Sequence, residues 1–307
     1  MTAVKTRFDI LTLATGDFEQ IARRWREIEE LGFDGAWLSD SLSLLGTADY
    51  EAWSLLAALS PLTSKLRIGT LVTQITFRHP VLLAAQAITV DRISGGRLEL
   101  GIGAGDYLSD SAAVGQDPWP LGERLERFDE QLSVLDKALR GERVDYRGRF
   151  YRTAGASLAT PVQQPRPPLV VAGQAPGSLR LVARYADGWN TLGGQPLSKS
   201  GQQPLPLVQA VERTREQVRL LEEYCRELGR DASAIRRSVL PYRSETDPLT
   251  SIDSFDEFVG RYSEIGFTQF VFYWPPVANL RTQEPLSSSQ QRTLESIAAE
   301  RLVGREA

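Results

Sequence analysis

Side chains that usually perform catalysis are scarce in this 307-residue sequence. It has one histidine (His79), one cysteine (Cys225) and four lysines, at positions 5, 65, 137 and 199. A Ser-His-Asp hydrolase would have to use His79, and a zinc site of His and Cys has too few ligands. A Schiff-base enzyme needs a lysine at a buried strand end, where none of the four is expected. The chain's own side chains are therefore poorly equipped for chemistry, which favours a bound cofactor.

Small and amide residues gather where the expected strands end. These ends read Asp40-Ser41, Thr73-Gln74, Gly103-Ala104-Gly105-Asp106, Ala172-Gly173-Gln174 and Asn190-Thr191. Glycines allow a ring to approach closely, the hydroxyl and amide side chains can bond a heterocycle, and helix N-termini bind phosphate. The set lacks the three convergent carboxylates of a typical magnesium site, so no metal is expected. It suits a large, flat, anionic organic cofactor.

The elements that position these residues alternate along the chain. The apolar and β-branched runs predict strands at 8–13, 35–39, 66–73, 97–102, 169–172, 188–191, 235–242 and 269–273. Helical periodicity between them predicts helices at 18–31, 49–59, 80–93, 122–139, 177–185, 207–228, 255–265 and 287–303. Eight strand-helix units favour one (β/α)8 barrel domain spanning 1–307, with a doubly wound sheet as the alternative.

Two segments interrupt this alternation, and several helix ends carry capping signals. Residues 142–168 predict an inserted hairpin near 144–151 and a proline-rich approach to the next strand, and 193–206 predicts a mobile loop. We expect Asp17 with Gln20, and Ser254 with Glu257, to form capping boxes. His79 precedes Pro80 and is expected to shape a helix entrance.

Composition excludes several classes of protein. The net charge is −4, with arginines interleaved among acidic residues, which argues against a nucleic-acid surface. No apolar run approaches a membrane span, and the first residues lack the apolar core of a signal peptide. A single cysteine cannot form an internal disulfide, so the expected location is the cytoplasm.

The segment 91–103, DRISGGRLELGIG, resembles the strand-four signature of the luciferase-like flavin and deazaflavin oxidoreductases. Trp37-Leu38-Ser39-Asp40, Gly122-Glu123-Arg124 and 184–190 (RYADGWN) are similar to the same superfamily, and the likeness runs from residue 8 to about 275. It implies a TIM barrel that binds coenzyme F420 or, alternatively, reduced FMN, often as a homodimer.

The resemblance also implies roles for individual residues. Leu71-Val72 matches the place of a non-prolyl cis peptide against the deazaflavin ring. Gly103, Ala104 and Gly105 would run beside the cofactor, and Ala172, Gly173 and Gln174 would meet its phosphate-bearing side chain. Ser41, Thr73 and Asn190 complete the expected cofactor-binding set. Several F420-dependent members have histidine where this chain has Ser41, which argues against alcohol oxidation that relies on that base.

Asp40 and Asp106 are the candidate catalytic residues. Asp40 would bond a ring nitrogen or only cap a turn, and Asp106 would act as a general acid or lie as a solvated loop residue. The expected function is hydride transfer between F420 and a small organic substrate. The alternatives are an FMNH2-dependent monooxygenase and a non-catalytic flavin-binding protein.

Overall fold

Eight parallel strands close into a barrel in the computed structural model, which describes residues 5–42, 48–105, 108–196, 203–242, 244–245, 247–276, 279 and 286–302. Around the barrel the hydrogen-bonded order is β1-β10-β9-β8-β7-β4-β3-β2. The strands are β1 (Arg7–Thr12), β2 (Gly35–Leu38), β3 (Arg67–Gln74), β4 (Leu98–Gly103), β7 (Leu169–Ala172), β8 (Gly188–Thr191), β9 (Arg236–Val239) and β10 (Gln269–Tyr273). The predicted (β/α)8 barrel is confirmed.

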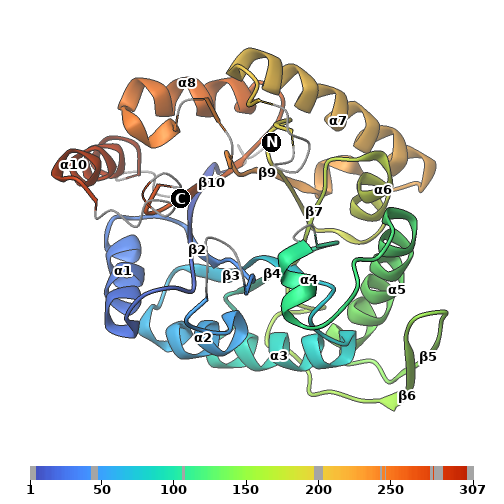
Figure 1. Ribbon diagram of the computed structural model, residues 1–307. Coiled ribbons are helices and arrows are strands. Elements are labelled where there is room, and N and C mark those ends of the chain that lie inside the picture. The colour runs from blue at the N-terminus through green and yellow to red at the C-terminus, as the bar shows by residue number, and fades with distance from the viewer. Residues whose placement is uncertain are drawn as a thin grey trace.

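Helices form a ring around the barrel (Figure 1). They are α1 (Phe18–Glu30), α2 (Ala52–Leu59), α3 (Pro80–Ile93), α5 (Leu121–Leu139), α6 (Pro176–Tyr185), α7 (Leu207–Glu227), α8 (Ile252–Ser263) and α10 (Ser288–Ile297), which continues as a π-helical turn, Ala298–Leu302. The bounds of α3 are those predicted, and His79 caps it because its Nδ1 accepts from the Val81 amide at 3.3 Å. No helix of the described residues is long and apolar enough to cross a membrane.

Two capping predictions are wrong. Asp17 occupies the N-cap position of α1, but its side chain makes no capping hydrogen bond. Helix α8 begins before the expected Ser254, because the extended Ser251 caps it and its hydroxyl accepts from the Ser254 amide at 3.1 Å. Helix α4 (Leu108–Ala113) was not predicted, since six residues are too few to show a helical period.

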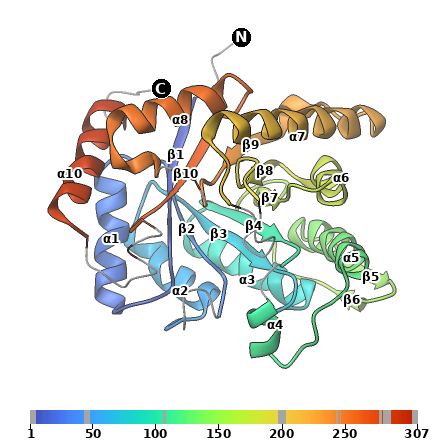
Figure 2. The same ribbon diagram turned by 45° about the horizontal axis from the view of Figure 1, so that its top comes forward.

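The predicted insertion is an antiparallel hairpin of β5 (Val144–Arg147) and β6 (Arg152–Ala156). Figure 2 shows the hairpin outside α5, away from the barrel. Glu130 of α5 holds the hairpin turn because its carboxylate accepts from the backbone amides of residues 149, 150 and 151, at 2.7, 3.0 and 3.1 Å. The insertion therefore leaves the strand order of the barrel unchanged.

The N-terminal end of the barrel interior is filled by an ion cluster. Glu99 of β4 pairs with Arg7 (2.7 Å), Arg67 (3.1 Å) and Arg236. Burial raises the pKa of Glu99, but the attraction of the three arginines outweighs burial and lowers the pKa to about 2. The neighbouring Asp9 has a raised pKa, because burial outweighs its attraction to Arg7. The charged side chains fill this end of the barrel, so a ligand would have to bind at the opposite end.

An apolar layer lies above the ion cluster. It is built around Trp37, whose indole donates to Asp9 at 2.9 Å. A Cβ on Gly69 would lie 2.8 Å from the Trp37 ring, so the glycine makes room for the indole. The layer comprises Leu11, Trp37, Leu71, Val170, Leu240 and Val271.

Candidate functional site

The C-terminal ends of the strands form the mouth of the barrel, where active sites of this fold lie. The structure brings the ends of β2, β3 and β4 together with the short helix α4, which lies inside the ring of outer helices (Figure 1). Asp40, Ser41, Gln74 and Gly103 to Gly105 meet there. Asp106 lies outside the described residues.

Strand β3 bulges beside β4, because their register shifts between Thr70 and Thr73. The Leu71–Val72 peptide bond is cis, which confirms the expectation from the resemblance. A Cβ on Gly103 would lie 2.8 Å from Val72 Cγ2, so Gly103 is required for the bulge to pack. Val72 is partly exposed and stands next to the strip of small residues from Gly103 to Gly105.

Two of the predicted cofactor-binding residues are engaged elsewhere in the fold. Thr73 is fully buried, and its hydroxyl accepts from the Trp53 indole of α2 at 2.9 Å. Asn190 is buried, and its amide nitrogen donates to Ser238 at 2.9 Å, between β8 and β9. For Thr73 the reason is the bulge, because the register of β3 shifts between Thr70 and Thr73. Asn190 lies beside Ala172 of β7 and Ser238 of β9 in the register of the barrel.

Asp40 is held by a buried arginine. Arg78 donates to Oδ2 of Asp40 at 2.6 Å and to Oδ1 at 3.0 Å, and also pairs with Glu51 at the start of α2. The pKa of Asp40 is nevertheless raised, because burial outweighs the attraction of Arg78. Proton transfer to Asp40 would break this ion pair, so the geometry gives Asp40 a positioning role between β2, α2 and α3.

A second carboxylate, Asp110 of α4, is fully buried at the mouth. Ser41 donates its hydroxyl to Oδ2 and Oδ1 of Asp110, at 2.8 and 3.0 Å, and the Leu42 amide donates to Oδ1 at 2.9 Å. Gln74 donates to Oδ2 at 2.6 Å and to the Asp40 carbonyl at 3.1 Å. Sequence reasoning missed Asp110, because it lies in an unpredicted helix and its partners are 36 or more positions away.

The strip Gly103–Gly105 is fixed from both sides. Arg124, in the first turn of α5, donates to the Gly105 carbonyl at 2.7 Å. A Cβ on Gly105 would lie 3.2 Å from Gln74 Oε1 and 3.8 Å from Thr76 Oγ1. That Thr76 hydroxyl is buried and has no hydrogen-bond partner among the described residues. A bound ligand beside Gly105 would give it one.

The opposite side of the mouth carries a helix N-terminus without a side-chain cap. Helix α6 starts at Pro176, directly after Ala172 to Gln174, and its N-cap Ala175 offers no side-chain acceptor. Gly173 admits the first turn of this helix, since a Cβ there would lie 2.4 Å from Ser178 Oγ. The amides of that turn are free of a side-chain cap, an arrangement that attracts phosphate.

These features fit a deazaflavin or flavin nucleotide. A strip poor in side chains can meet a ring, the unpartnered Thr76 hydroxyl can bond it, and the uncapped α6 can meet a phosphate. The rings of Tyr242, which follows β9, and Tyr273, which ends β10, lie 6.0 Å apart and add apolar area. No cluster of His, Cys, Asp and Glu in the described part of the chain could hold a metal ion.

Comparison with known proteins agrees with this geometry. The model of the luciferase-like monooxygenase family matches residues 1–264. An F420-dependent glucose-6-phosphate dehydrogenase of Segniliparus rotundus is 32% identical over 236 residues, which are 74% of this chain and 65% of that protein. The chain thus matches just under two thirds of that relative's length.

Two solved structures share the fold over nearly their whole length. A coenzyme F420 dependent tetrahydromethanopterin reductase of Methanopyrus kandleri has a TM-score of 0.74 at 18% identity, covering 97% of this chain and 98% of that one. An F420-dependent secondary alcohol dehydrogenase has a TM-score of 0.76 at 17% identity, covering 98% and 99%.

Proposed function

Because this chain belongs to the luciferase-like monooxygenase family, we propose that it is an F420-dependent oxidoreductase that transfers hydride to or from a small organic substrate. The names of its relatives support the cofactor, since F420-dependent glucose-6-phosphate dehydrogenases match it at 28 to 34% identity. The observation that carries the proposal is the side-chain-poor strip Gly103–Gly105, which faces the mouth together with the uncapped N-terminus of α6.

The chain's residues would hold the cofactor at three places. The bulge at Leu71-Val72 and the strip Gly103–Gly105 would support the ring, with Ser41 at its edge. Residues 172–174 and the first turn of α6 would bind the phosphate. When bound, F420 supplies the hydride acceptor or donor, and the chain supplies orientation and exclusion of water. Asp106, which directly follows the strip in the sequence, remains the proposed acid.

A parallel binding titration with F420 and FMN tests the cofactor. Oxidised F420 is fluorescent, so its binding is measured by anisotropy, and FMN is titrated under the same anaerobic conditions. We expect F420 to bind at least tenfold more tightly. Binding of FMN more than tenfold tighter than F420, with oxygen-dependent turnover of FMNH2, refutes the proposal in favour of a monooxygenase.

We also propose that the protein is a homodimer that pairs through α2 and α3. Helix α3 has only two charged residues, Asp91 and Arg92, both in its last turn, and a helix that is apolar on all sides is normally buried. Leu82 and Ile93 of α3 are 55% and 49% exposed in the single chain. The exposed residues of α2 and the turn after it, Ser54, Ala58 and Pro61, are uncharged as well.

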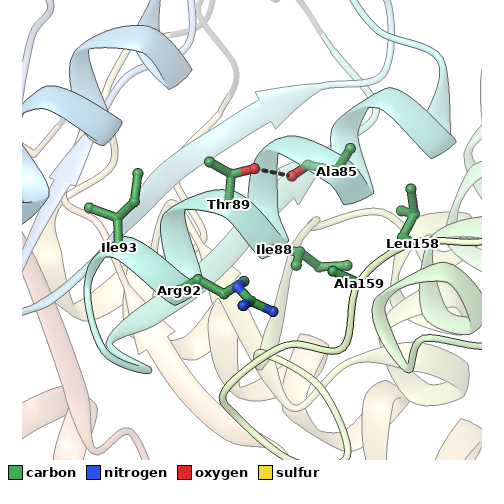
Figure 3. Close-up of a pocket in the computed structure, with 7 residues that line it drawn as sticks. All are labelled: Ala85, Ile88, Thr89, Arg92, Ile93, Leu158 and Ala159. Carbon is green, nitrogen blue, oxygen red and sulfur yellow. Dashed lines mark hydrogen bonds between the residues drawn. The ribbon is translucent and has the colours of Figure 1, made fainter.

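A groove beside α3 adds to this uncharged face (Figure 3). It has a volume of about 430 Å³ and lies between α3 and the segment at Leu158 and Ala159. Its walls are apolar except for Thr89 and Arg92, whose guanidinium also donates to the Thr160 carbonyl at 3.3 Å. By contrast, α5 and α7 expose many charges, so α2 and α3 are the face that a second copy would cover.

A further inference from the structure

We infer that Arg127, together with the inserted hairpin, positions the cofactor strip Gly103–Gly105 from outside the barrel. Arg127 is a positioning residue, because it acts through Arg124 rather than by contact with a ligand. The inference deepens the proposed function, and its consequence for cofactor binding rests on that function. It gives the hairpin of β5 and β6, which lies outside α5, a part in the site at the mouth (Figure 2).

The segment between α4 and α5 is exposed. Residues 114–118 are all exposed, and Trp119 is the next residue and is partly buried. Helix α5 then begins without a side-chain cap, because its N-cap residue is Pro120. Leu121, its first residue, is 62% exposed. Burial of Trp119 and of side chains further along α5 therefore fixes where the first turn of this helix lies.

Arg127 of α5 joins Trp119 to the hairpin turn. Its guanidinium lies over the Trp119 ring at 4.3 Å and over the Phe150 ring at 4.1 Å. Glu123, one helical turn earlier, orients this guanidinium, because its Oε1 lies 2.7 Å from Nη2 and 2.8 Å from Nε of Arg127. A guanidinium within about 6 Å of a ring centroid is attracted to the ring face. The residue before α5 is thus attached to the hairpin through Arg127.

The hairpin turn is itself held against α5. Glu130 accepts from three successive amides of the turn, including that of Phe150 at 3.0 Å. Arg149 lies over the other partner of Arg127, the Phe150 ring, at 4.8 Å and pairs with Glu126 at 2.7 Å. Several bonds along α5 therefore fix the ring on which Arg127 stacks.

Adjacent residues of α5 connect this stack to the cofactor strip. Glu123 bonds Arg127, whereas Arg124 donates to the Gly105 carbonyl at 2.7 Å. Successive residues of an α-helix are turned by about 100°, so the two side chains reach different sides of the same turn. A shift of this turn would carry the Arg124 guanidinium away from Gly105. The stack of Arg127 therefore helps to fix the strip on which the cofactor ring is proposed to lie.

The hairpin turn also reaches the start of α3. The rings of Tyr151 and His79 meet edge to face, with centroids 5.7 Å apart. Arg78, directly before His79, donates to both oxygens of Asp40 at the mouth. The hairpin turn thus contacts two helix starts, and each of them carries an arginine bonded to a residue of the mouth. This arrangement supports a positioning role for the insertion.

Hydrogen exchange of the cofactor-free protein tests the positioning directly. The Arg124 amide bonds the Pro120 carbonyl at 2.9 Å and reports on the first turn of α5. The Ile75 amide bonds the Gly103 carbonyl at 3.3 Å and reports on the strip. Arg127→Met keeps a side chain of similar length and removes the guanidinium. We expect both amides to exchange about 3- to 30-fold faster, with the amides of β10 unchanged.

Three further variants separate this effect from a general loss of packing. Arg127→Lys keeps a cation beside the rings and should restore slow exchange in large part. Phe150→Leu removes the ring but keeps an apolar side chain, and should reproduce the effect of Arg127→Met. Arg180→Met is the matched control, because Arg180 of α6 is exposed and lies over the ring of Tyr224 of α7 at 4.5 Å. This control should leave both amides unchanged.

A double-mutant cycle on F420 binding tests whether Arg127 acts through Arg124. Arg127→Met should weaken F420 binding by about 3- to 30-fold in the wild-type chain, and by less than about twofold in the Arg124→Met background. Two residues that act independently would give the same fold-change in both backgrounds. Anisotropy of F420 measures the four dissociation constants, and thermal melts of the same proteins report the stability of the fold.

Three results overturn the inference while F420 binding by the wild type stands. They are unchanged exchange of both amides in Arg127→Met, faster exchange in equal measure throughout the barrel, or an equal loss of F420 affinity in the two backgrounds. If Arg127→Met does not fold, Phe150→Leu takes its place in both experiments. Failure of the wild type to bind F420 overturns the proposed function instead, and the exchange rates then still decide whether Arg127 positions the strip.

Discussion

Replacing Arg78 with methionine tests whether Asp40 is a buried, paired anion. The substitution keeps a side chain of similar length but removes the guanidinium that bonds both Asp40 oxygens, at 2.6 and 3.0 Å. The side chains of Arg78 and Asp40 are only 7% and 2% exposed, so solvent cannot replace the lost partner. Breaking a buried ion pair in this way costs about 3–5 kcal/mol. We expect Arg78→Met to lose that much free energy of unfolding at pH 7.

The stability deficit of Arg78→Met depends on pH through the charge of Asp40. Burial raises the pKa of Asp40 even in the presence of Arg78, and removal of Arg78 raises it further. A carboxyl whose pKa is raised in the folded state stabilises the fold fully below its unfolded pKa of about 3.9, and that stabilisation is lost as pH rises through the folded pKa. The deficit of Arg78→Met should therefore shrink as the pH falls from 7 towards 4, where Asp40 enters the fold protonated.

Urea unfolding at several pH values measures this deficit, with two control variants. Arg143→Met removes an exposed pair, in which Arg143 and Asp145 are 72% and 65% exposed, and should cost less than about 1 kcal/mol. The double variant Arg78→Met/Asp40→Asn should recover part of the loss and show a weaker pH dependence. A deficit below about 1 kcal/mol at pH 7, or one that grows on acidification, would refute the buried-anion assignment.

Three further predictions concern the barrel and its outer face. The pKa of Glu99 is lowered from 4.5 to about 2, so its ionisation should contribute about 3 kcal/mol to the free energy of unfolding above pH 5. This contribution is lost as the pH falls to 2. Urea titrations of Glu99→Gln should lack this part of the pH dependence. Ala85→Arg, on the outer face of α3, should convert a dimer to a monomer in light scattering, and a persistent dimer would exclude this face. Gly101→Ala should destabilise the barrel by about 1–3 kcal/mol or more, because its Cβ would lie 2.0 Å from the Thr70 carbonyl oxygen. Gly260→Ala is the control, since it has open space around it and should stabilise α8 by up to about 1 kcal/mol. Thermal melts measure both effects.

Local patterns in the sequence are enough to predict the strands and helices of the barrel. The strands at Leu169–Ala172, Gly188–Thr191 and Gln269–Tyr273 and the helix Pro80–Ile93 have the bounds that the sequence predicts. Each is a buried apolar run or a helical period bounded by glycine or proline, so its limits are set within a few residues. Errors of one to three residues elsewhere fall at helix ends, such as the start of α2, and at strand ends, such as that of β9, which ends at Val239 and not at the predicted Tyr242.

The candidate site was less predictable, because its polar contacts join distant parts of the chain. The strip Gly103–Gly105 is visible as a glycine pattern, but the ion pair of Asp40 with Arg78 spans 38 positions and the bond of Ser41 with Asp110 spans 69. As a carboxylate directly after a strand, Asp40 is predicted to bond a ring nitrogen of the cofactor or only to cap a turn. The fold shows that Arg78, which lies between β3 and α3, donates to both oxygens of this carboxylate.

Three of the buried carboxylates in the barrel differ in the groups that bond them. At the closed end, Glu99 is ringed by arginines, and protonation would leave these charges uncompensated, so the group stabilises without reacting. Asp40 is likewise committed to Arg78. Asp110 accepts from the Ser41 hydroxyl, the Leu42 amide and the Gln74 side-chain amide. Burial alone therefore does not mark a reactive carboxylate in this fold. Arginines hold Glu99 and Asp40, whereas a hydroxyl and two amides at the mouth bond Asp110.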